Sequence, residues 1–204
     1  QGVLCLHCQY RLPWTGFHRR PADNPFAEQF WGRVPLQAAT ALCYFSRGGI
    51  TQQLVHRLKY RGDTEVGLFL GKLLGRRLLQ AEAFRGVDLI LPVPLHPRKK
   101  RRRGYNQSDY FAQGVAEGMQ RPWDGAALCR HNATPSQTRK GRMERFANVA
   151  SAFGINAPNI LRGRHILLVD DVMTTGATLE ACGRKILEIP ETKLSFATIA
   201  FATR

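Results

Sequence analysis

The chain has 204 residues, 44% of them hydrophobic, and its 30 Lys and Arg against 15 Asp and Glu leave a formal net charge of +15. That length suits one α/β domain with a small appendage. No apolar run reaches the roughly eighteen residues that cross a bilayer, and no basic-then-apolar leader is evident. A membrane-spanning protein is therefore excluded, and the cytosol is the expected compartment. The excess of positive charge predicts an anionic partner, either a polyphosphate molecule or a nucleic acid.

Residues 1–35 form a first segment rich in cysteine, histidine, arginine, proline and aromatic residues. Cys5 and Cys8 have the spacing of two thiolates that bind one zinc ion, but they supply only half of a tetrahedral site. His7 or His18 could serve as a substitute ligand. An odd number of cysteines without an export signal indicates reduced thiols rather than disulfides. The remaining cysteines are expected to be small core residues: Cys43, Cys129 and Cys182.

From residue 36 onward, strand-like and helical patterns alternate along the chain. This alternation predicts a mainly parallel sheet flanked by helices. The predicted elements, in chain order, are a strand at 39–45, an amphipathic stretch at 50–58, a helix from 66 to about 83, a strand at 87–93, a helix from 108 to about 118, a short strand at 126–129, a strand at 166–169 with a helix running to about 188, and a final strand at 194–200.

The most informative segment is residues 166–178. Four apolar residues, 166–169, predict a strand buried on both faces, and Asp170 and Asp171 follow at its carboxyl end, where open α/β sheets bind ligands. The next residues, 174–178, offer threonine hydroxyls, a glycine and the first N–H groups of a helix, a combination that binds phosphate. Carboxylates beside an anion site suit a sugar phosphate, whose hydroxyls donate to the carboxylates while its phosphate accepts from the loop.

This segment resembles the type I phosphoribosyltransferase family. In that family the acidic pair holds the ribose hydroxyls of phosphoribosyl pyrophosphate (PRPP), which binds with Mg²⁺. The resemblance therefore implies that Asp170 and Asp171 are the catalytic carboxylates. The residues that it implies for the 5′-phosphate are Thr174, Thr175, Gly176, Ala177 and Thr178. A response-regulator acidic pocket and the carboxylate pair of a nucleotide-sugar glycosyltransferase are the alternatives, and a receiver domain would carry its acidic pair near its start.

A second segment, residues 88–107, joins a buried strand to six consecutive cations at 98–103. Pro92, Pro94 and Pro97 fix φ and remove N–H donors, so we expect the strand to stop and the basic run to be presented in an extended form. In type I phosphoribosyltransferases the loop at this place receives the pyrophosphate. The alternative is a solvated, self-repelling surface loop.

This segment also resembles a particular subfamily, the ComF/GntX-like proteins of bacterial DNA uptake and utilisation. The resemblance rests on residues 92–95 and 103–107, together with residues 58–63 and the pattern Gln137-Thr138 with Arg142, Arg145 and Asn148. It implies a phosphoribosyltransferase-like domain at 36–204 behind a partial zinc-ribbon-like segment at 1–35. The pyrophosphate residues that it implies are Pro94, Leu95, Arg103, Gly104 and Lys59. Lys59 could equally be one of the cations beside a glycine-capped helix end.

Residues 130–148 are predicted to be either a mobile hood over the ligand or a plain surface connection. The basic run and the ring of Tyr105 could also contact single-stranded DNA, although Tyr110 and Phe111 begin a helix whose apolar face belongs in the core. The residues predicted for hood or DNA contact are Lys99, Lys100, Arg101, Arg102, Tyr105, Arg142 and Arg145.

Two functions of different class follow from these patterns. The first is a catalyst that transfers phosphoribosyl to an unidentified acceptor with Mg²⁺. The second is a non-catalytic module that senses PRPP or a nucleotide and binds single-stranded DNA, a helicase or another DNA-processing partner. A repressor that reads operator DNA is a third and remoter possibility.

Overall fold

The computed structural model describes residues 3–131 and 152–202. Its helices and strands, in chain order, are α1 (Leu6–Tyr10), η1 (Phe17–Arg19), α2 (Pro25–Glu28), β1 (Ala38–Phe45), α3 (Ile50–Tyr60), α4 (Thr64–Gln80), α5 (Glu82–Arg85), β2 (Leu89–Pro92), α6 (Pro97–Arg103), α7 (Gln107–Met119), β3 (Leu128–Arg130), β4 (Phe153–Ile155), η2 (Pro158–Ile160), β5 (His165–Met173), α9 (Ala177–Leu187) and β6 (Lys193–Ala202). None of the helices in these two ranges is long and apolar enough to span a membrane.

A four-stranded sheet in the order β1-β6-β5-β2 forms the centre of the molecule, and each neighbouring pair is parallel. The predicted parallel sheet is confirmed, and its strands lie where the apolar runs placed them. In the centre of the sheet, Val169 on β5 is opposite Ala197 on β6 and Pro92 on β2. Parallel pairing brings the carboxyl ends of these strands to one edge, where the acidic pair of β5 lies. A separate antiparallel pair joins β3 to β4.

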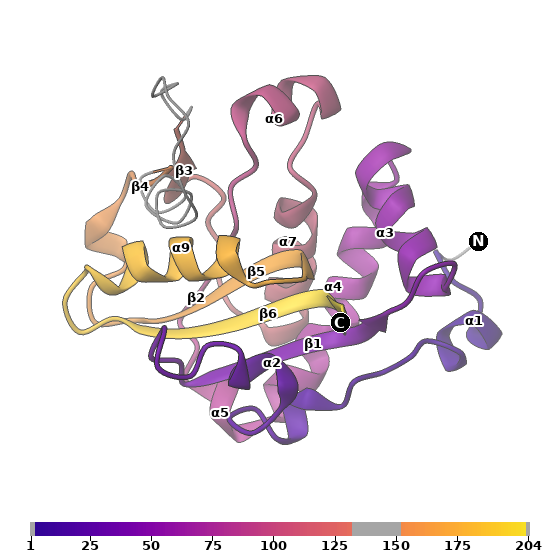
Figure 1. The fold of residues 1–204 in the computed structure, drawn as a ribbon, viewed down its shortest axis with the longest axis horizontal. Coiled ribbons are helices and arrows are strands. Elements are labelled where there is room, and N and C mark those ends of the chain that lie inside the picture. The colour runs from indigo at the N-terminus through magenta and orange to yellow at the C-terminus, as the bar shows by residue number, and fades with distance from the viewer. Residues whose placement is uncertain (1–2, 132–151, 203–204) are drawn as a thin grey trace, which may run out of the picture.

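Helices cover both faces of the sheet, which gives three layers (Figure 1). One face packs against α3, α4, α5 and α7, and the other against α2 and α9. The strand residues of β5 alternate between these two cores: Leu167 and Val169 belong to the first, and Ile166 and Leu168 to the second. Burial on both faces explains why this strand is an unbroken apolar run.

The early segment before β1 contributes large side chains to the core. Phe26 and Phe30 are fully buried, and Phe30 contacts Phe196 of β6 edge-to-face with 4.9 Å between ring centroids. Asn24 begins α2 by accepting hydrogen bonds from the N–H groups of Phe26 and Ala27. This part of residues 1–35 packs directly on the sheet. The division of the chain at residue 35 stays a prediction.

Glycines allow α4 and α7 to pack with their backbones in contact. A Cβ atom placed on Gly71 would lie 2.4 Å from the carbonyl oxygen of Phe111, and one on Gly75 would lie 2.4 Å from that of Val115. On the facing helix, a Cβ on Gly114 would meet the carbonyl oxygen of Leu68 at 2.2 Å. Small residues at a four-residue spacing on α4 therefore set how closely α7 can approach.

The predicted extended form of the basic run is wrong, because residues 97–103 form the short helix α6. His96 caps it by accepting from the N–H of Arg98 at 3.2 Å, and Pro97 occupies the first turn. Proline is tolerated there because that N–H has no partner in a helix. Gly104, with a φ of 87°, ends α6 in the left-handed conformation that glycine adopts most easily.

The cysteine predictions are confirmed in part. Cys43 and Cys182 are buried, as expected of small core residues. Cys129 on β3 is only half-buried, and its Sγ lies 3.5 Å from Nε2 of His131. A three-residue strand at the end of the sheet layer does not bury both of its faces, which explains the difference.

Candidate functional site

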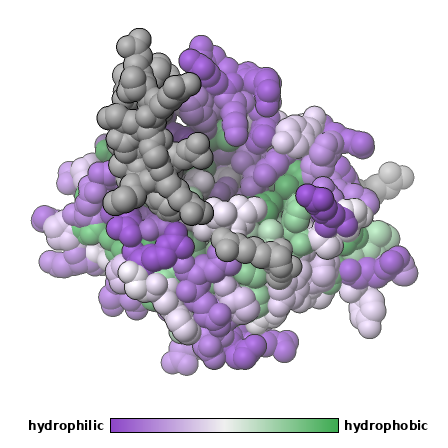
Figure 2. Space-filling view, in the orientation of Figure 1, coloured by the Kyte–Doolittle hydropathy of each residue, from purple (hydrophilic) through white to green (hydrophobic). Residues whose placement is uncertain are grey.

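A cleft of about 590 Å³ opens at the carboxyl ends of β1, β2 and β5. It is bounded by α3, by the segment that leads into α6, and by the turn between β5 and α9. Figure 2 shows hydrophilic residues over the protruding α6 beside this edge of the sheet. The residues that line the cleft are Phe45, Gln52, Val55, His56, Lys59, Tyr60, Val93, Pro94, Leu95, Lys99, Arg103, Gln107, Arg130, Asp170, Asp171, Val172, Thr174 and Thr178.

Two carboxylates from β5 lie in the cleft in different environments. Asp171 Oδ1 is 2.8 Å from Lys59 Nζ, and the two side chains are 6% and 22% exposed. Its other oxygen, Oδ2, is buried and has no hydrogen-bond partner among the described residues. Asp170 Oδ1 accepts from Ser108 Oγ at 2.9 Å and from the N–H of Asp171 at 2.8 Å. A buried acceptor without a partner is where a ligand hydroxyl would be most strongly bound.

Burial, followed by repulsion from the adjacent Asp171 carboxylate, raises the pKa of Asp170 from 3.8 to about 7. The N–H of Asp171, the hydroxyl of Ser108 and the ammonium of Lys59 act in the opposite direction. Without ligand, the cleft therefore holds its two carboxylates at an electrostatic cost that a positive charge or hydrogen-bond donors would relieve.

We expect Asp170→Asn to stabilise the protein increasingly as the pH rises. The pKa of Asp170 is about 7 in the folded state, against 3.8 when it is unperturbed, as in the unfolded chain. The contribution of this group to the free energy of unfolding is therefore fully present below pH 3.8 and is lost as the pH rises through about 7. Asparagine escapes that loss, so its advantage in free energy of unfolding should grow by about 2–3 kcal/mol between pH 5 and pH 8. Urea unfolding at both values measures it. The exposed Asp23→Asn is the matched control, and an advantage of Asp170→Asn that does not vary with pH would contradict the expectation.

The turn between β5 and α9 has the geometry of an anion site. Gly176 precedes α9 with a φ of 75°, and a Cβ there would lie 2.6 Å from the ring of Phe30, so only glycine fits. No side chain caps this end of α9. The hydroxyl of Thr175 accepts from the N–H of Ala177 at a long 3.5 Å. Thr174 and Thr178 line the cleft, so the turn presents hydroxyls and helix N–H groups beside the carboxylates.

The opposite wall of the cleft is basic. Pro94 and Leu95 follow β2, and Arg103 ends α6 with its guanidinium 5.5 Å from the ring centroid of Tyr60. Arg103 also donates to the side-chain oxygen of Gln107, a residue that is buried at the start of α7. These two contacts hold the cation in place at the cleft wall.

Comparison with known proteins finds similarity to one family. The phosphoribosyl transferase domain family matches residues 110–203. The DNA utilization protein YhgH of Escherichia coli O157:H7 is 36% identical over 137 residues, which are 66% of this chain and 60% of that protein. Competence protein F of Haemophilus influenzae is 29% identical over 140 residues, 67% of this chain and 61% of that protein. These matches support a ComF-like member of the phosphoribosyltransferase superfamily.

The predicted fold class and the predicted resemblance are thereby confirmed for this ComF-like chain. It spans 60% of the length of the first relative and 61% of the second. Among solved structures, the glutamine phosphoribosylpyrophosphate amidotransferase from B. subtilis is 20% identical, with a TM-score of 0.45, over 66% of this chain and 26% of that one.

Most of the residues predicted for PRPP come together in this ComF-like cleft, although their roles stay predictions. Those that line it are Asp170, Asp171, Thr174, Thr178, Pro94, Leu95, Arg103 and Lys59, while Thr175, Gly176, Ala177 and Gly104 lie on or next to the same elements without lining it. Of the residues predicted for hood or DNA contact, Lys99 lines the cleft, and Lys100, Arg101, Arg102 and Tyr105 do not. Predicted hood residues Arg142 and Arg145 lie outside the described residues, as do Gln137, Thr138 and Asn148.

The residues present do not fit a zinc site. Cys5 is exposed and Cys8 half-buried at the two ends of the first turn of α1. Within residues 3–131 and 152–202 there is no group of three or more His, Cys, Asp or Glu side chains that could hold a metal ion. A tetrahedral zinc ion requires four ligands, of which this pair supplies two.

Several residues of the cleft were missed from sequence. Ser108 contacts Asp170 across 62 positions of the chain, and its only signal was its place at the start of a predicted helix. Gln52 and His56 lie one turn apart on α3, so they share a face with Lys59. That spacing of polar residues on an otherwise amphipathic helix could have indicated them. Arg130 lines the cleft from β3, and its Nε is buried without a hydrogen-bond partner among the described residues.

Proposed function

We propose that this chain binds PRPP with Mg²⁺ in the cleft and transfers phosphoribosyl to an acceptor that the residues do not identify. One observation carries the proposal: the carboxylates of β5, the threonine turn and the basic wall all face one cleft. A ligand with ribose hydroxyls, a phosphate and a pyrophosphate is complementary to those three surfaces. The match of the phosphoribosyl transferase domain family to residues 110–203 supports the same substrate.

The carboxylates are suited to Mg²⁺ bound with PRPP. Magnesium in enzymes is commonly held by one or two carboxylates together with substrate phosphates and water. The buried Oδ2 of Asp171, which has no partner among the described residues, is the atom that fits this role best. When bound, Mg²⁺ would supply positive charge that offsets the negative charge of the pyrophosphate leaving group.

The side chains of the cleft would divide the remaining work. Asp170 and Asp171 would accept hydrogen bonds from the ribose hydroxyls and favour the positive charge that develops at the anomeric carbon as pyrophosphate departs. Ser108 would act as a positioning residue, because its hydroxyl donates to Asp170. Arg103 and Lys99 would stabilise the pyrophosphate, while the turn at Thr174–Thr178 would hold the 5′-phosphate.

Calorimetric titration of PRPP into the protein tests the proposal. We expect saturable binding in Mg²⁺ and weaker binding in EDTA. Ribose 5-phosphate and pyrophosphate should each compete, since each would occupy one part of the cleft. Absence of PRPP binding in Mg²⁺ would overturn the proposal.

We infer a second candidate function, binding of single-stranded DNA, from the exposure of α6. Arg98 to Arg102 are five consecutive cations, all exposed, on a helix that projects from the molecule (Figure 1). The relatives named for DNA utilization and competence favour such a partner. The rings beside the run do not form an open stacking track, because Phe111 is buried and Tyr105 donates its hydroxyl to the carbonyl of Leu58. Electrostatic contact with phosphates would therefore dominate.

Neutralising Lys100, Arg101 and Arg102 to glutamine should flatten the salt dependence of DNA binding. Three lost phosphate contacts would reduce the slope of log affinity against log salt by about 2. A labelled single strand measured by anisotropy at several salt concentrations gives that slope. The matched control neutralises three exposed arginines away from α6: Arg20, Arg162 and Arg164. Equal slopes for the two triple variants would show that α6 has no particular role.

A further inference from the structure

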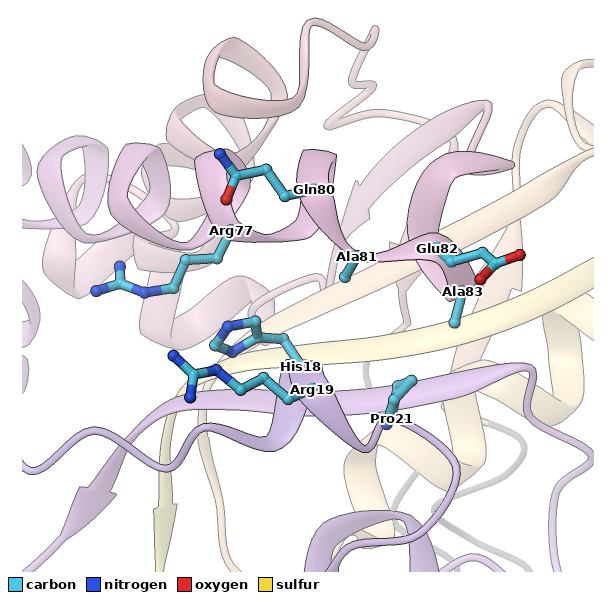
Figure 3. Close-up of a pocket in the computed structure, with 8 residues that line it drawn as sticks. All are labelled: His18, Arg19, Pro21, Arg77, Gln80, Ala81, Glu82 and Ala83. Atoms are coloured by element: carbon cyan, nitrogen blue, oxygen red, sulfur yellow. The ribbon is translucent and has the colours of Figure 1, made fainter.

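A second cavity, of about 610 Å³, lies between η1 and the C-terminal end of α4 (Figure 3). The helix α4 has 17 residues and therefore a length of about 25 Å. The first cleft contains Lys59 of α3, the helix that precedes α4 in the chain. The second cavity is lined by residues from the last turn of α4 and the start of α5. The two cavities share no lining residue, so the second is separate from the proposed PRPP site.

Three basic side chains line this cavity. The guanidinium of Arg77 lies 4.1 Å from the ring centroid of Trp14, and its Nη1 donates to the carbonyl of Leu73 at 2.9 Å. Figure 3 shows the imidazole of His18 next to the guanidiniums of Arg77 and Arg19 on the same side of the cavity. Stacking on Trp14 and the hydrogen bond to Leu73 hold Arg77 in a defined orientation.

No carboxylate neutralises these cations within the part of the chain that the structure describes. Arg77 and Arg19 form no ion pair there, and the carboxylate of Glu82 points away from both guanidiniums (Figure 3). Burial lowers the pKa of Arg77, and Arg19 lowers it further. Burial also lowers the pKa of His18, with Arg77 and Arg19 acting in the same direction. Burial raises the pKa of the nearby Cys43 thiol to about 12, so it supplies no negative charge.

We propose that this cavity binds a small molecule carrying a phosphate or pyrophosphate group, held between Arg19 and Arg77 with His18 as a further hydrogen-bond partner. Two guanidiniums match the charge of one phosphate dianion, and each can donate two parallel hydrogen bonds to its oxygens. The volume lies in the range of small-molecule sites. Apolar surface from Pro21, Ala81 and Ala83 would contact the rest of the ligand.

A purely structural role accounts for only part of this arrangement. Arg77 lies in the last turn of α4, where a cation interacts favourably with the helix dipole, and its packing on Trp14 buries apolar surface. Neither effect requires Arg19 and His18 to approach the same guanidinium. Bringing like charges together costs free energy, and a bound anion would remove that cost.

Trp14, which does not line the cavity but stacks on Arg77 at its wall, provides a readout of binding there. The chain has three tryptophans, and none lines the cleft of the proposed PRPP site. Trp31→Phe and Trp123→Phe together leave Trp14 as the sole tryptophan. Inorganic pyrophosphate added to this variant is expected to change the Trp14 fluorescence with a saturable dependence on concentration. Arg19→Gln should weaken that binding about 10-fold, because it removes a charge-assisted contact.

Arg20→Gln is the matched control, since it removes the same charge from the neighbouring exposed residue, which does not line the cavity. It should leave the affinity within about twofold. Arg77→Gln should weaken pyrophosphate binding as Arg19→Gln does. Its matched control is Arg76→Gln, which removes the same charge from a neighbouring exposed residue. An unchanged Trp14 signal, or equal losses in Arg19→Gln and Arg20→Gln, would overturn the proposal. So would a response to a single strand of about twelve nucleotides without one to pyrophosphate, which would assign the contact to nucleic acid.

Discussion

Asp171→Asn is expected to weaken the binding of PRPP about 100-fold, the largest functional effect of any single substitution in the cleft. Oδ2 of Asp171 is buried without a partner among the described residues, and Oδ1 lies 2.8 Å from Lys59 Nζ. A ribose hydroxyl or Mg²⁺ would complete the coordination of Oδ2. Asparagine keeps the shape but loses the charge, and its amide places donors where an acceptor is required. Losing charge-assisted hydrogen bonds in a buried site costs about 2–3 kcal/mol.

Calorimetry on this variant and on Asp23→Asn separates that role from a general change of charge. Asp23 is exposed and does not line the cleft, so its substitution should change the affinity by less than about twofold. A thermal melt of each variant checks that the fold survives the loss of the Lys59 contact. Affinity of Asp171→Asn within threefold of the wild type, with the fold intact, would remove the carboxylate from the ribose site.

The parts of this molecule that could be predicted from sequence are those in which neighbouring residues carry the whole signal. The apolar run 166–169 predicted a strand buried on both faces, and its register in the sheet confirms that. Asp170 and Asp171 follow directly, so their position at the cleft edge required only the rule that parallel strands bind ligands at their carboxyl ends. The threonine turn belongs to the same local unit.

Features that depend on distant contacts could not be predicted in this way. Ser108 reaches Asp170 only because α7 packs against β5, and nothing near either residue indicates the pairing. The basic run was wrongly predicted to be extended, because Pro97 can begin a helix as well as end a strand. His96 as a cap and Gly104 as a stop decide the matter in favour of α6.

The close contact of α4 with α7 also depends on residues that are distant in the sequence. Disturbing it is expected to have the largest effect on stability. We expect Gly71→Val to lower the free energy of unfolding by about 3 kcal/mol. A Cβ at this position would lie 2.4 Å from the carbonyl oxygen of Phe111 and 2.7 Å from the amide nitrogen of Val115. Both are backbone atoms of α7, so no rotamer change relieves the overlap. The helices must separate, which loosens the fully buried Leu70 and Leu74 beside them.

Urea unfolding followed by circular dichroism measures this loss, with Gly86→Val as the matched control. Gly86 has a φ of −80°, and a Cβ there would meet only an imidazole nitrogen at 3.6 Å, an ordinary contact. Its substitution should cost less than about 1 kcal/mol. Gly71→Ala should fall between the two, because the same overlap is partly offset by a gain of up to about 1 kcal/mol in helix propensity. Equal stability of Gly71→Val and Gly86→Val would show that the two helices can move apart at little cost.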